Sequence, residues 1–373
     1  MVELKMSNEV YPKNFEDLKK EIHDKGLCGE CGGCVSFCSA HDLKAIQMSE
    51  NGPPTYLNKE KCLKCGICYL VCPQTDVLNE ELGSRFEYKE PIGSWRKIAS
   101  TQATTEDIRQ KATDGGTVTS ILMFLLDHKL IDGAIVSRQI NPFHRVPFYA
   151  NTKKDLIEAA GSHFTMAGQM DELEHYGSFS PSVTELKSIY KSDIASIAFV
   201  GTPCQVHSLR KMQELHIIPS HVVKYALGLF CNMNYVLDDK KCQQIERQFG
   251  FSMKDTIKVN MKDDIAFYFK DKPTIHVPFD DMNTYCRSAC KICKDFSNYY
   301  ADISFGGLGS KDGFTTTIVR TKLGSELYDG ALKDGYISEV GNLNTPIKKS
   351  EMLAKVIGFS EMKKQRASRF SVK

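Results

Sequence analysis

Eight cysteines near the N-terminus fall into two copies of one spacing, C-x2-C-x2-C-x3-C, and no other feature of the sequence constrains the fold as strongly. The copies read "CGECGGCVSFCS" and "CLKCGICYLVCP". Such a run lets three thiolates wrap one corner of a 4Fe-4S cluster from a tight loop, while the fourth cysteine ligates the neighbouring cluster. The spacing therefore predicts two 4Fe-4S clusters that lie close together.

Because the fourth cysteine of each motif ligates the cluster of the other motif, the eight cysteines divide into two sets. The predicted ligands of the first cluster are Cys28, Cys31, Cys34 and Cys72, and those of the second are Cys62, Cys65, Cys68 and Cys38. Structural zinc sites pair two C-x2-C knuckles and do not place four cysteines in one short run, which disfavours zinc. Between the two motifs, residues 45–58 are expected to form a hairpin with its turn at Asn51 to Pro54.

The chain is long enough for more than one domain. It has 373 residues, and its net charge of +2 favours no polyanionic partner. The N-terminus lacks the apolar segment of a signal peptide, and the longest apolar run, residues 118–126, is too short to cross a bilayer. We expect a cytoplasmic protein, whose fourteen cysteines serve as metal ligands or redox groups because reducing compartments disfavour structural disulfides.

Strands and helices alternate after residue 100, which predicts an α/β domain. The expected elements are a helix over residues 117–129, strands over 133–137, 196–200 and 222–231, alternating strands within 256–279, and a strand and a helix within 301–335. Chemistry in such domains gathers beyond the carboxyl ends of the strands. Cys204 and Cys231 both follow predicted strands.

The sequence lacks the usual nucleotide-binding motifs. There is no G-x-G-x-x-G after a first strand and no G-x-x-x-x-G-K, so neither a standard dinucleotide fold nor a P-loop is supported. Gly115 and Gly116 directly precede a predicted helix, where free N–H groups and the helix dipole attract phosphate. Glycine also serves turn geometry alone at such a position, and both interpretations stay open.

Seven segments of the chain, taken together, resemble the coenzyme F420 hydrogenase/dehydrogenase beta-subunit family. They read "DGGTVTSIL", "LIDGAIV", "GSHFT", "VGTPCQVHSLRK", "GLFC", "CKICKDF" and "ADISFGGLGSKDGFTTTIVRT". With the two cysteine motifs ahead of them, the order of parts is most similar to the electron-input subunits of F420H2 dehydrogenase complexes. The resemblance implies five parts in this order: an extension (1–20), a bacterial-type 2x(4Fe-4S) ferredoxin-like domain (21–82), a linker (83–99), an α/β flavin-binding beta-subunit domain (100–340) and a basic C-terminal helix (341–373). The implied fold class of the chain is α+β or α/β.

The resemblance also implies where FAD and a third 4Fe-4S cluster would bind. The implied flavin contacts are Asp114, Gly115, Gly116, Thr117, Thr119, Gly161, Ser162, His163, Thr165, Gly201, Thr202 and Gln205. The implied cluster ligands are Cys204, Cys231, Cys290 and Cys293. Family members often have Lys-Tyr where this chain has His163 and Phe164. A cationic contact therefore either passes to His163 or is absent.

Two further cysteines have no clear place in this scheme. Cys242 lies on a predicted polar helix and is expected to be structural or free. Cys286 lies four residues before Cys290, so it either replaces a ligand or packs beside the third cluster. We favour packing beside the cluster.

The resemblance implies an oxidoreductase that exchanges a hydride with coenzyme F420. A deazaflavin exchanges hydride whereas iron–sulfur clusters move single electrons, so FAD is expected to connect them and to pass electrons to or from a partner protein or complex. Two alternatives remain. One is a non-catalytic ferredoxin-like electron carrier, and the other is a ferredoxin-dependent flavin reductase of a tetrapyrrole-type substrate.

The C-terminal tail is rich in positive charge. Its basic residues are Lys348, Lys349, Lys355, Lys363, Lys364, Arg366, Arg369 and Lys373, with apolar residues between them. A basic amphipathic helix either docks on an acidic partner subunit or the surface of a membrane complex, or is simply solvated. We favour the solvated helix.

Overall fold

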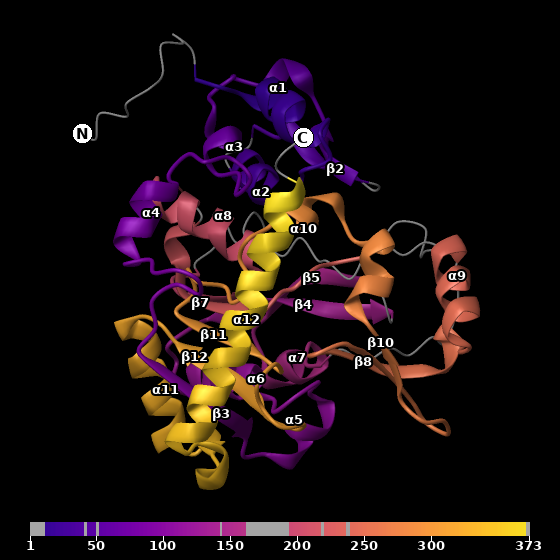
Figure 1. Ribbon diagram of the computed structural model, residues 1–373. Coiled ribbons are helices and arrows are strands. Elements are labelled where there is room, and N and C mark those ends of the chain that lie inside the picture. The colour runs from indigo at the N-terminus through magenta and orange to yellow at the C-terminus, as the bar shows by residue number, and fades with distance from the viewer. Residues whose placement is uncertain are drawn as a thin grey trace.

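The computed structural model describes residues 12–40, 43–49, 52–141, 144–161, 194–217, 220–235 and 239–370 (Figure 1). The N-terminal cysteine motifs lie in a small module at one end of the molecule, next to a larger α/β body. This arrangement confirms the predicted fold class.

The N-terminal module is built from short elements. These are α1 (Phe15–Leu18), the π-helical turn Lys19–His23, α2 (Gly33–Ala40), the antiparallel hairpin of β1 (Ile46–Ser49) and β2 (Gly52–Tyr56), the 3-10 turn Lys59–Lys61, and α3 (Ile67–Leu70). The hairpin is confirmed, but its turn was predicted too late, since Ser49 pairs with Gly52 and Pro53 and Pro54 belong to β2. Proline is tolerated there because an edge strand leaves part of its N–H groups unpaired.

The polar stretch that follows is partly helical. Residues 83–99 were expected as a linker, and their first residues belong to α4 (Asn79–Arg85). The buried Leu82 of α4 packs into the same apolar core as Val71 of the module and Leu209 of the large domain. The module and the large domain therefore share a core.

An eight-stranded sheet forms the large domain. Its strands are β3 (Lys97–Ala103), β4 (Gly133–Asn141), β5 (His144–Ala150), β6 (Ile197–Gly201), β7 (Val223–Leu229), β11 (Ile303–Gly306), β12 (Thr315–Val319) and β13 (Ile337–Glu339), in the order β13-β3-β12-β11-β7-β6-β4-β5. Strands β4, β6, β7 and β11 are parallel to their neighbours in this central group, and the flanking pairs are antiparallel. The parallel strands thus end at the same edge, where ligands bind in open α/β sheets.

Helices cover both faces of this sheet. One face packs on α6 (Thr117–Asp127) and α11 (Lys322–Lys333), and the other packs on α8 (Pro203–Glu214), the N-terminal module and α12 (Pro346–Phe370). Shorter elements are α5 (Glu106–Lys111), α7 (Lys153–Glu158) and the 3-10 turns Ser220–Val222 and Gly341–Leu343. The strands and helices expected in this domain are confirmed, although the strand predicted to reach residue 231 ends at Leu229.

A smaller unit follows β7. It consists of α9 (Asp239–Phe249), an antiparallel sheet of β8 (Thr256–Met261), β9 (Ile265–Phe269) and β10 (Ile275–Val277), the 3-10 turns Met253–Asp255 and Phe279–Tyr285, and α10 (Ser288–Ile292). Cys242 on α9 is fully buried in the core of this unit, in agreement with a structural role. The unit brings β8 beside the edge at which the parallel strands of the main sheet end.

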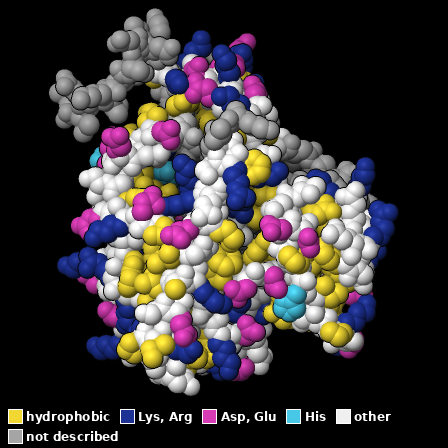
Figure 2. Space-filling view, in the orientation of Figure 1, with side chains coloured by type: hydrophobic (Ala, Val, Ile, Leu, Met, Phe, Trp, Pro, Cys, Tyr) yellow, Lys and Arg dark blue, Asp and Glu magenta, His cyan; other side chains and the backbone are white. Residues whose placement is uncertain are grey.

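The C-terminal helix α12 packs along the chain's own surface, which differs from a solvated tail (Figure 1). Its buried residues, Met352, Val356, Ser360, Lys363 and Ala367, form one stripe. Several of its lysines pair with acidic side chains of other segments, as Lys355 does with Asp263. On the face shown in Figure 2, basic and acidic side chains are accordingly interspersed. No helix in the described ranges has the length and apolarity needed to span a membrane.

Candidate functional site

The first set of N-terminal cysteines comes together as the spacing predicts. Burial raises the pKa of the Cys28 thiol, and the thiols of Cys31 and Cys72 raise it further. Burial likewise raises the pKa of Cys34, followed by the effects of Cys31 and Cys28. Cys72 belongs to the second motif in the sequence but lies with the cysteines of the first motif, as the predicted exchange of fourth ligands requires. That these thiols ligate a cluster stays a prediction.

The second set is also assembled. Burial raises the pKa of the Cys68 thiol to about 12, and Cys65 and Cys62 contribute to the rise. The thiols of Cys62 and Cys65 act in the same way on the pKa of Cys38, after burial, and the Cys38 sulfur accepts the N–H of Ala45 at 3.3 Å. N–H groups directed at sulfur suit a cluster site, because such hydrogen bonds tune cluster potentials. Cys65 is exposed, so this set lies at the molecular surface.

The thiols of the described residues do not form a ready-made site for one metal ion. In the parts of the chain that the structure describes, no group of three or more His, Cys, Asp and Glu side chains is arranged to hold one ion. A zinc ion needs its thiolates about 2.3 Å away, which forces the sulfurs close together. The choice between a multi-iron cluster and zinc therefore continues to rest on the spacing of the cysteines in the sequence.

A third cysteine group lies where the parallel strands end. Cys204 follows β6 on the first turn of α8, Cys231 follows β7, and Cys290 and Cys293 lie on and just after α10. Burial raises the pKa of the Cys204 thiol well above its ordinary value, and the thiols of Cys293 and Cys231 add to this. Sequence segments far apart in the chain thus deliver the four cysteines that the family resemblance implies.

The surroundings of this group also suit a cluster. The backbone N–H of Asn234 points at the Cys290 sulfur at 3.4 Å, and its side-chain N–H points at the Cys231 sulfur at 3.5 Å. Cys286 is buried beside Cys290 in the core of the small unit, and its hydrogen bond lowers the pKa of the Cys290 thiol to about 6. That Cys286 packs beside a cluster and does not ligate it stays a prediction.

The first ferredoxin motif lies directly against this third group. A Cβ placed on Gly29 would lie 3.8 Å from the sulfur of Cys204. The buried Arg287 pairs with Glu30 at 2.6 Å, and Lys211 of α8 donates to the carbonyl oxygen of Cys72 at 2.8 Å. The backbone of the first motif at Gly29 therefore lies beside a thiol of the third group.

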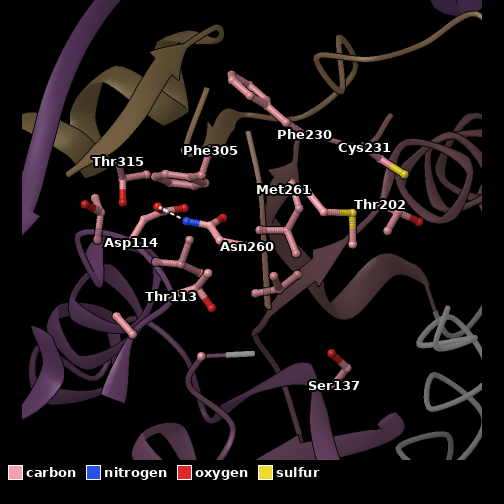
Figure 3. A pocket seen from close by; sticks show the side chains of 18 of the residues that line it. Thr113, Asp114, Ser137, Thr202, Phe230, Cys231, Asn260, Met261, Phe305 and Thr315 are labelled. Atoms are coloured by element: carbon pink, nitrogen blue, oxygen red, sulfur yellow. Dashed lines mark hydrogen bonds between the residues drawn. The ribbon is translucent and has the colours of Figure 1, made fainter. Parts of the chain in front are cut away.

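A cavity of about 400 Å³ opens beside Cys231, within the usual range for cofactor sites. Figure 3 shows Asp114 and Thr315 toward one end of it, and Thr202 and Cys231 toward the other. Of the predicted flavin contacts, those that line it are Asp114, Gly116, Thr117, Thr119, Gly161, Gly201, Thr202 and Gln205. The predicted contacts Ser162, His163 and Thr165 lie outside the described residues.

Gly115 is the described exception, because it does not line the cavity. Its N–H donates to the Thr315 hydroxyl at 3.0 Å, and an added Cβ would meet the Thr101 carbonyl oxygen at 2.5 Å. The position therefore requires glycine for close packing between β3 and β12. Gly116, at φ +74°, instead begins α6 and faces the cavity.

Two helices begin at the cavity. Helix α6 starts after Gly116, and α8 starts at Pro203, whose preceding residue Thr202 exchanges hydrogen bonds with Gln205 in a capping box. Proline in the first turn of α8 loses no helical hydrogen bond. At α8, Pro203 has no N–H and the capping box occupies the N–H of Gln205. The start of α6, where Gly116 provides no side-chain cap, is therefore the helix start better suited to phosphate oxygens.

Sequence reasoning missed part of the cavity wall. Asn260 of β8 donates to Asp114 at 3.0 Å, and Lys262 pairs with Asp114 at 3.4 Å and with Asp312 at 2.8 Å. Burial lowers the pKa of Lys262, but the two carboxylates outweigh this and raise it. Phe230 and Phe305 add aromatic surface. Nothing in the segment "VNMKDD" signalled this role, which depends on how the small sheet folds back.

Comparison with known proteins agrees with this geometry. Two family profiles describe the beta subunit of coenzyme F420 hydrogenase/dehydrogenase; the one for its N-terminal part matches residues 98–173, and the one for its C-terminal part matches residues 194–343. A 4Fe-4S binding domain profile matches residues 55–74, the second cysteine motif. The matched residues therefore include the cavity, the third cysteine group and part of the ferredoxin module.

Individual proteins also match this chain over most of its length. The beta subunit of the coenzyme F420 hydrogenase of Methanococcus voltae is 30% identical over 68% of this chain and 87% of its own length. The "F" subunit of the F(420)H(2) dehydrogenase of Methanosarcina mazei is 24% identical over 83% of each chain. In a solved structure of the xenon-derivatised F420-reducing [NiFe] hydrogenase complex from Methanosarcina barkeri, one chain matches with a TM-score of 0.65 and 26% identity, over 76% of this chain and 93% of that one. This chain therefore belongs to the coenzyme F420 hydrogenase/dehydrogenase beta-subunit family of iron–sulfur oxidoreductase subunits.

Proposed function

We propose that this chain is an iron–sulfur flavoprotein that oxidises or reduces coenzyme F420 and relays single electrons to or from a partner protein or complex. The observation that carries the proposal is the position of Cys231. It lines the cavity and also belongs to the third cysteine group, so a cofactor in the cavity would lie next to that group.

The residues of the cavity fit FAD. The N-terminal turn of α6 offers N–H groups to the diphosphate, while Phe230, Phe305 and the apolar wall offer surface to a ring system. Bound FAD would supply the exchange between hydride transfer and single-electron transfer. The protein's own tasks are to bind and orient this cofactor and to fix its place beside Cys231.

The positions of the cysteine groups suit electron transfer in the order third group, first ferredoxin group, second ferredoxin group, or in the reverse order. The third group contacts the first ferredoxin group through Gly29 and Cys204, and the second ferredoxin group ends at the exposed Cys65. Leu63, whose surface is 69% exposed, and Lys64 flank Cys65. A partner that binds this end of the module would receive or deliver electrons there.

The test is anaerobic purification followed by flavin identification, iron counting and an F420H2 oxidation assay with a dye acceptor. We expect about one FAD and about twelve irons per chain, as three 4Fe-4S clusters require. Reduced F420 should bleach the flavin first and the clusters afterwards. Protein without flavin would contradict the proposal and favour a simple electron carrier, and flavin bleaching with no later cluster reduction would refute the relay.

A further inference from the structure

Lys363 is a lysine in the interior of the protein. It belongs to the buried stripe of α12, and only 1% of its surface is exposed. Helix α12 packs against α10 and lies beyond residue 343, where the match to the family profile ends. A lysine is almost never fully buried unless its ammonium group is compensated.

Backbone oxygens around the third cysteine group receive this ammonium. The Nζ atom donates to the carbonyl oxygen of Cys231 at 2.5 Å and to that of Asp295 at 2.7 Å. These carbonyls belong to the loop after β7 and to the loop after α10. Lys363 therefore joins the loop that carries Cys231 to the loop that carries Cys293.

Carbonyl oxygens satisfy the hydrogen bonds of Lys363 but do not neutralise its charge. They belong to Cys231, a predicted cluster ligand, and to Asp295, which lies two residues after the predicted ligand Cys293 and carries a buried carboxylate. That carboxylate accepts the backbone N–H groups of Asn298 at 2.7 Å and Tyr299 at 3.2 Å. A cluster held by Cys231 and Cys293 would therefore bring negatively charged thiolates close to the Lys363 ammonium.

Two arginines lie near, but they are directed elsewhere. Arg320 donates to oxygens of Ile92, Ser297 and Ser304, and Arg366 donates to the carbonyl oxygen of Asn232. Neither has a hydrogen bond to Cys231 or Asp295 among those found in the described residues. Lys363 is the basic side chain that bridges the two cysteine loops.

We propose that Lys363 is a positioning residue of the third cluster: its buried ammonium offsets the charge of the thiolates and raises the reduction potential of that cluster. Reduction adds negative charge, and a nearby positive charge in a low-dielectric site stabilises the reduced form. The inference rests on the proposed third cluster. Through Lys363, the C-terminal helix would then influence the reduction potential of the third cluster and so the order in which the clusters are reduced.

The test compares Lys363→Met, Lys363→Arg and Lys355→Met in the full-length, cluster-loaded protein. Methionine keeps most of the length and apolar volume of lysine without its charge, and arginine keeps the charge. Lys355 lies on the exposed side of the same helix and pairs with Asp263, so its variant controls for loss of a lysine from α12. The readouts are iron content and a redox titration followed by electron paramagnetic resonance.

We expect Lys363→Met to move the midpoint potential of one cluster to a more negative value, with Lys363→Arg and Lys355→Met close to wild type. Loss of about four irons in the methionine variant alone would also support the proposal, since one 4Fe-4S cluster would then depend on the charge. Full iron with an unchanged midpoint in Lys363→Met would overturn it, as would an arginine variant as defective as the methionine one. Wild-type protein with about eight irons would instead show that the third cluster itself is absent.

Discussion

Asp114 and Lys262 meet at the cavity although almost 150 residues separate them, as their 3.4 Å ion pair shows. Both side chains are largely buried, at 16% and 15% exposure. Gly307 makes the meeting possible, because an added Cβ there would lie 2.6 Å from the Asp114 carboxylate and 2.7 Å from Cε of Lys262. A motif search finds Asp114 and the glycine loop, but the lysine partner becomes visible only once the small sheet is folded.

Replacing Lys262 with methionine should weaken both the fold and flavin binding. The change leaves the largely buried Asp114 carboxylate without its ion-pair partner, Lys262. We expect this to lower the free energy of unfolding by roughly 1–3 kcal/mol. The carboxylate would also repel the phosphates of a dinucleotide. Thermal unfolding and the flavin content of the purified variant measure the two effects.

Lys270→Met provides the control for this prediction, because Lys270 is exposed and lies directly after β9 of the same small sheet. The free energy of unfolding of that variant should lie within about 0.5 kcal/mol of the wild-type value, as is usual for surface substitutions. A Lys262→Met protein with normal flavin content and normal stability would exclude a role for the ion pair in the cavity.

At the scale of elements, α8 and the residue before α10 hold the ferredoxin module in place through hydrogen bonds and an ion pair. Ser208 and Lys211 of α8 bond to carbonyl oxygens of Val71, Cys72 and Thr75. Arg287, directly before α10, pairs with Glu30 in the first cysteine motif. The sequence predicts each element but not this fastening, since the partners are scattered single residues with no motif of their own.

Glu30→Gln should loosen this docking. A buried arginine that loses its carboxylate partner costs about 2 kcal/mol in stability. Electron transfer between the third group and the first ferredoxin group should slow, because transfer depends on their spacing. Stopped-flow absorbance after mixing with reduced F420 measures this as a longer delay between flavin bleaching and full cluster reduction.

Glu60→Gln is the matched control, since Glu60 is an exposed carboxylate two residues before Cys62 of the second motif. It should leave both stability and the delay unchanged. If Glu30→Gln and Glu60→Gln behaved alike, the Glu30–Arg287 pair would have no part in holding the module.

Helix α12 shows why the tail was harder to predict than the motifs. The count of basic residues suggested docking or solvation, whereas the spacing of Met352, Val356, Lys363 and Ala367 marks a buried stripe. A lysine within an apolar stripe is the signal that a count of charges misses. Deleting the residues after Ser350 would remove Lys363 and part of a core, so such a deletion cannot isolate an effect on partner binding.

In the molecule as a whole, the three cysteine groups follow one another from the cavity to the surface. Cys231 borders the cavity, Cys204 borders Gly29 of the first ferredoxin group, and Cys65 of the second group is exposed. The sequence predicts the members of each group, because ferredoxin spacing and family motifs name them. It does not predict the order of the groups in space, which depends on the docking of the module against α8.

This order predicts different effects for cysteines at the two ends of this series of groups. Cys65→Ala should lose about four irons, keep the bleaching of flavin by reduced F420 and keep reduction of the third cluster, because the break lies beyond it. Cys204→Ala should also keep flavin bleaching, but no cluster should then be reduced at the normal rate, since the first step out of the cavity is lost. Cys242→Ala, a buried cysteine outside the three groups, should retain full iron and the normal rate. Iron analysis with stopped-flow absorbance distinguishes these outcomes. Rapid cluster reduction in Cys204→Ala would mean that electrons leave the cavity by another route.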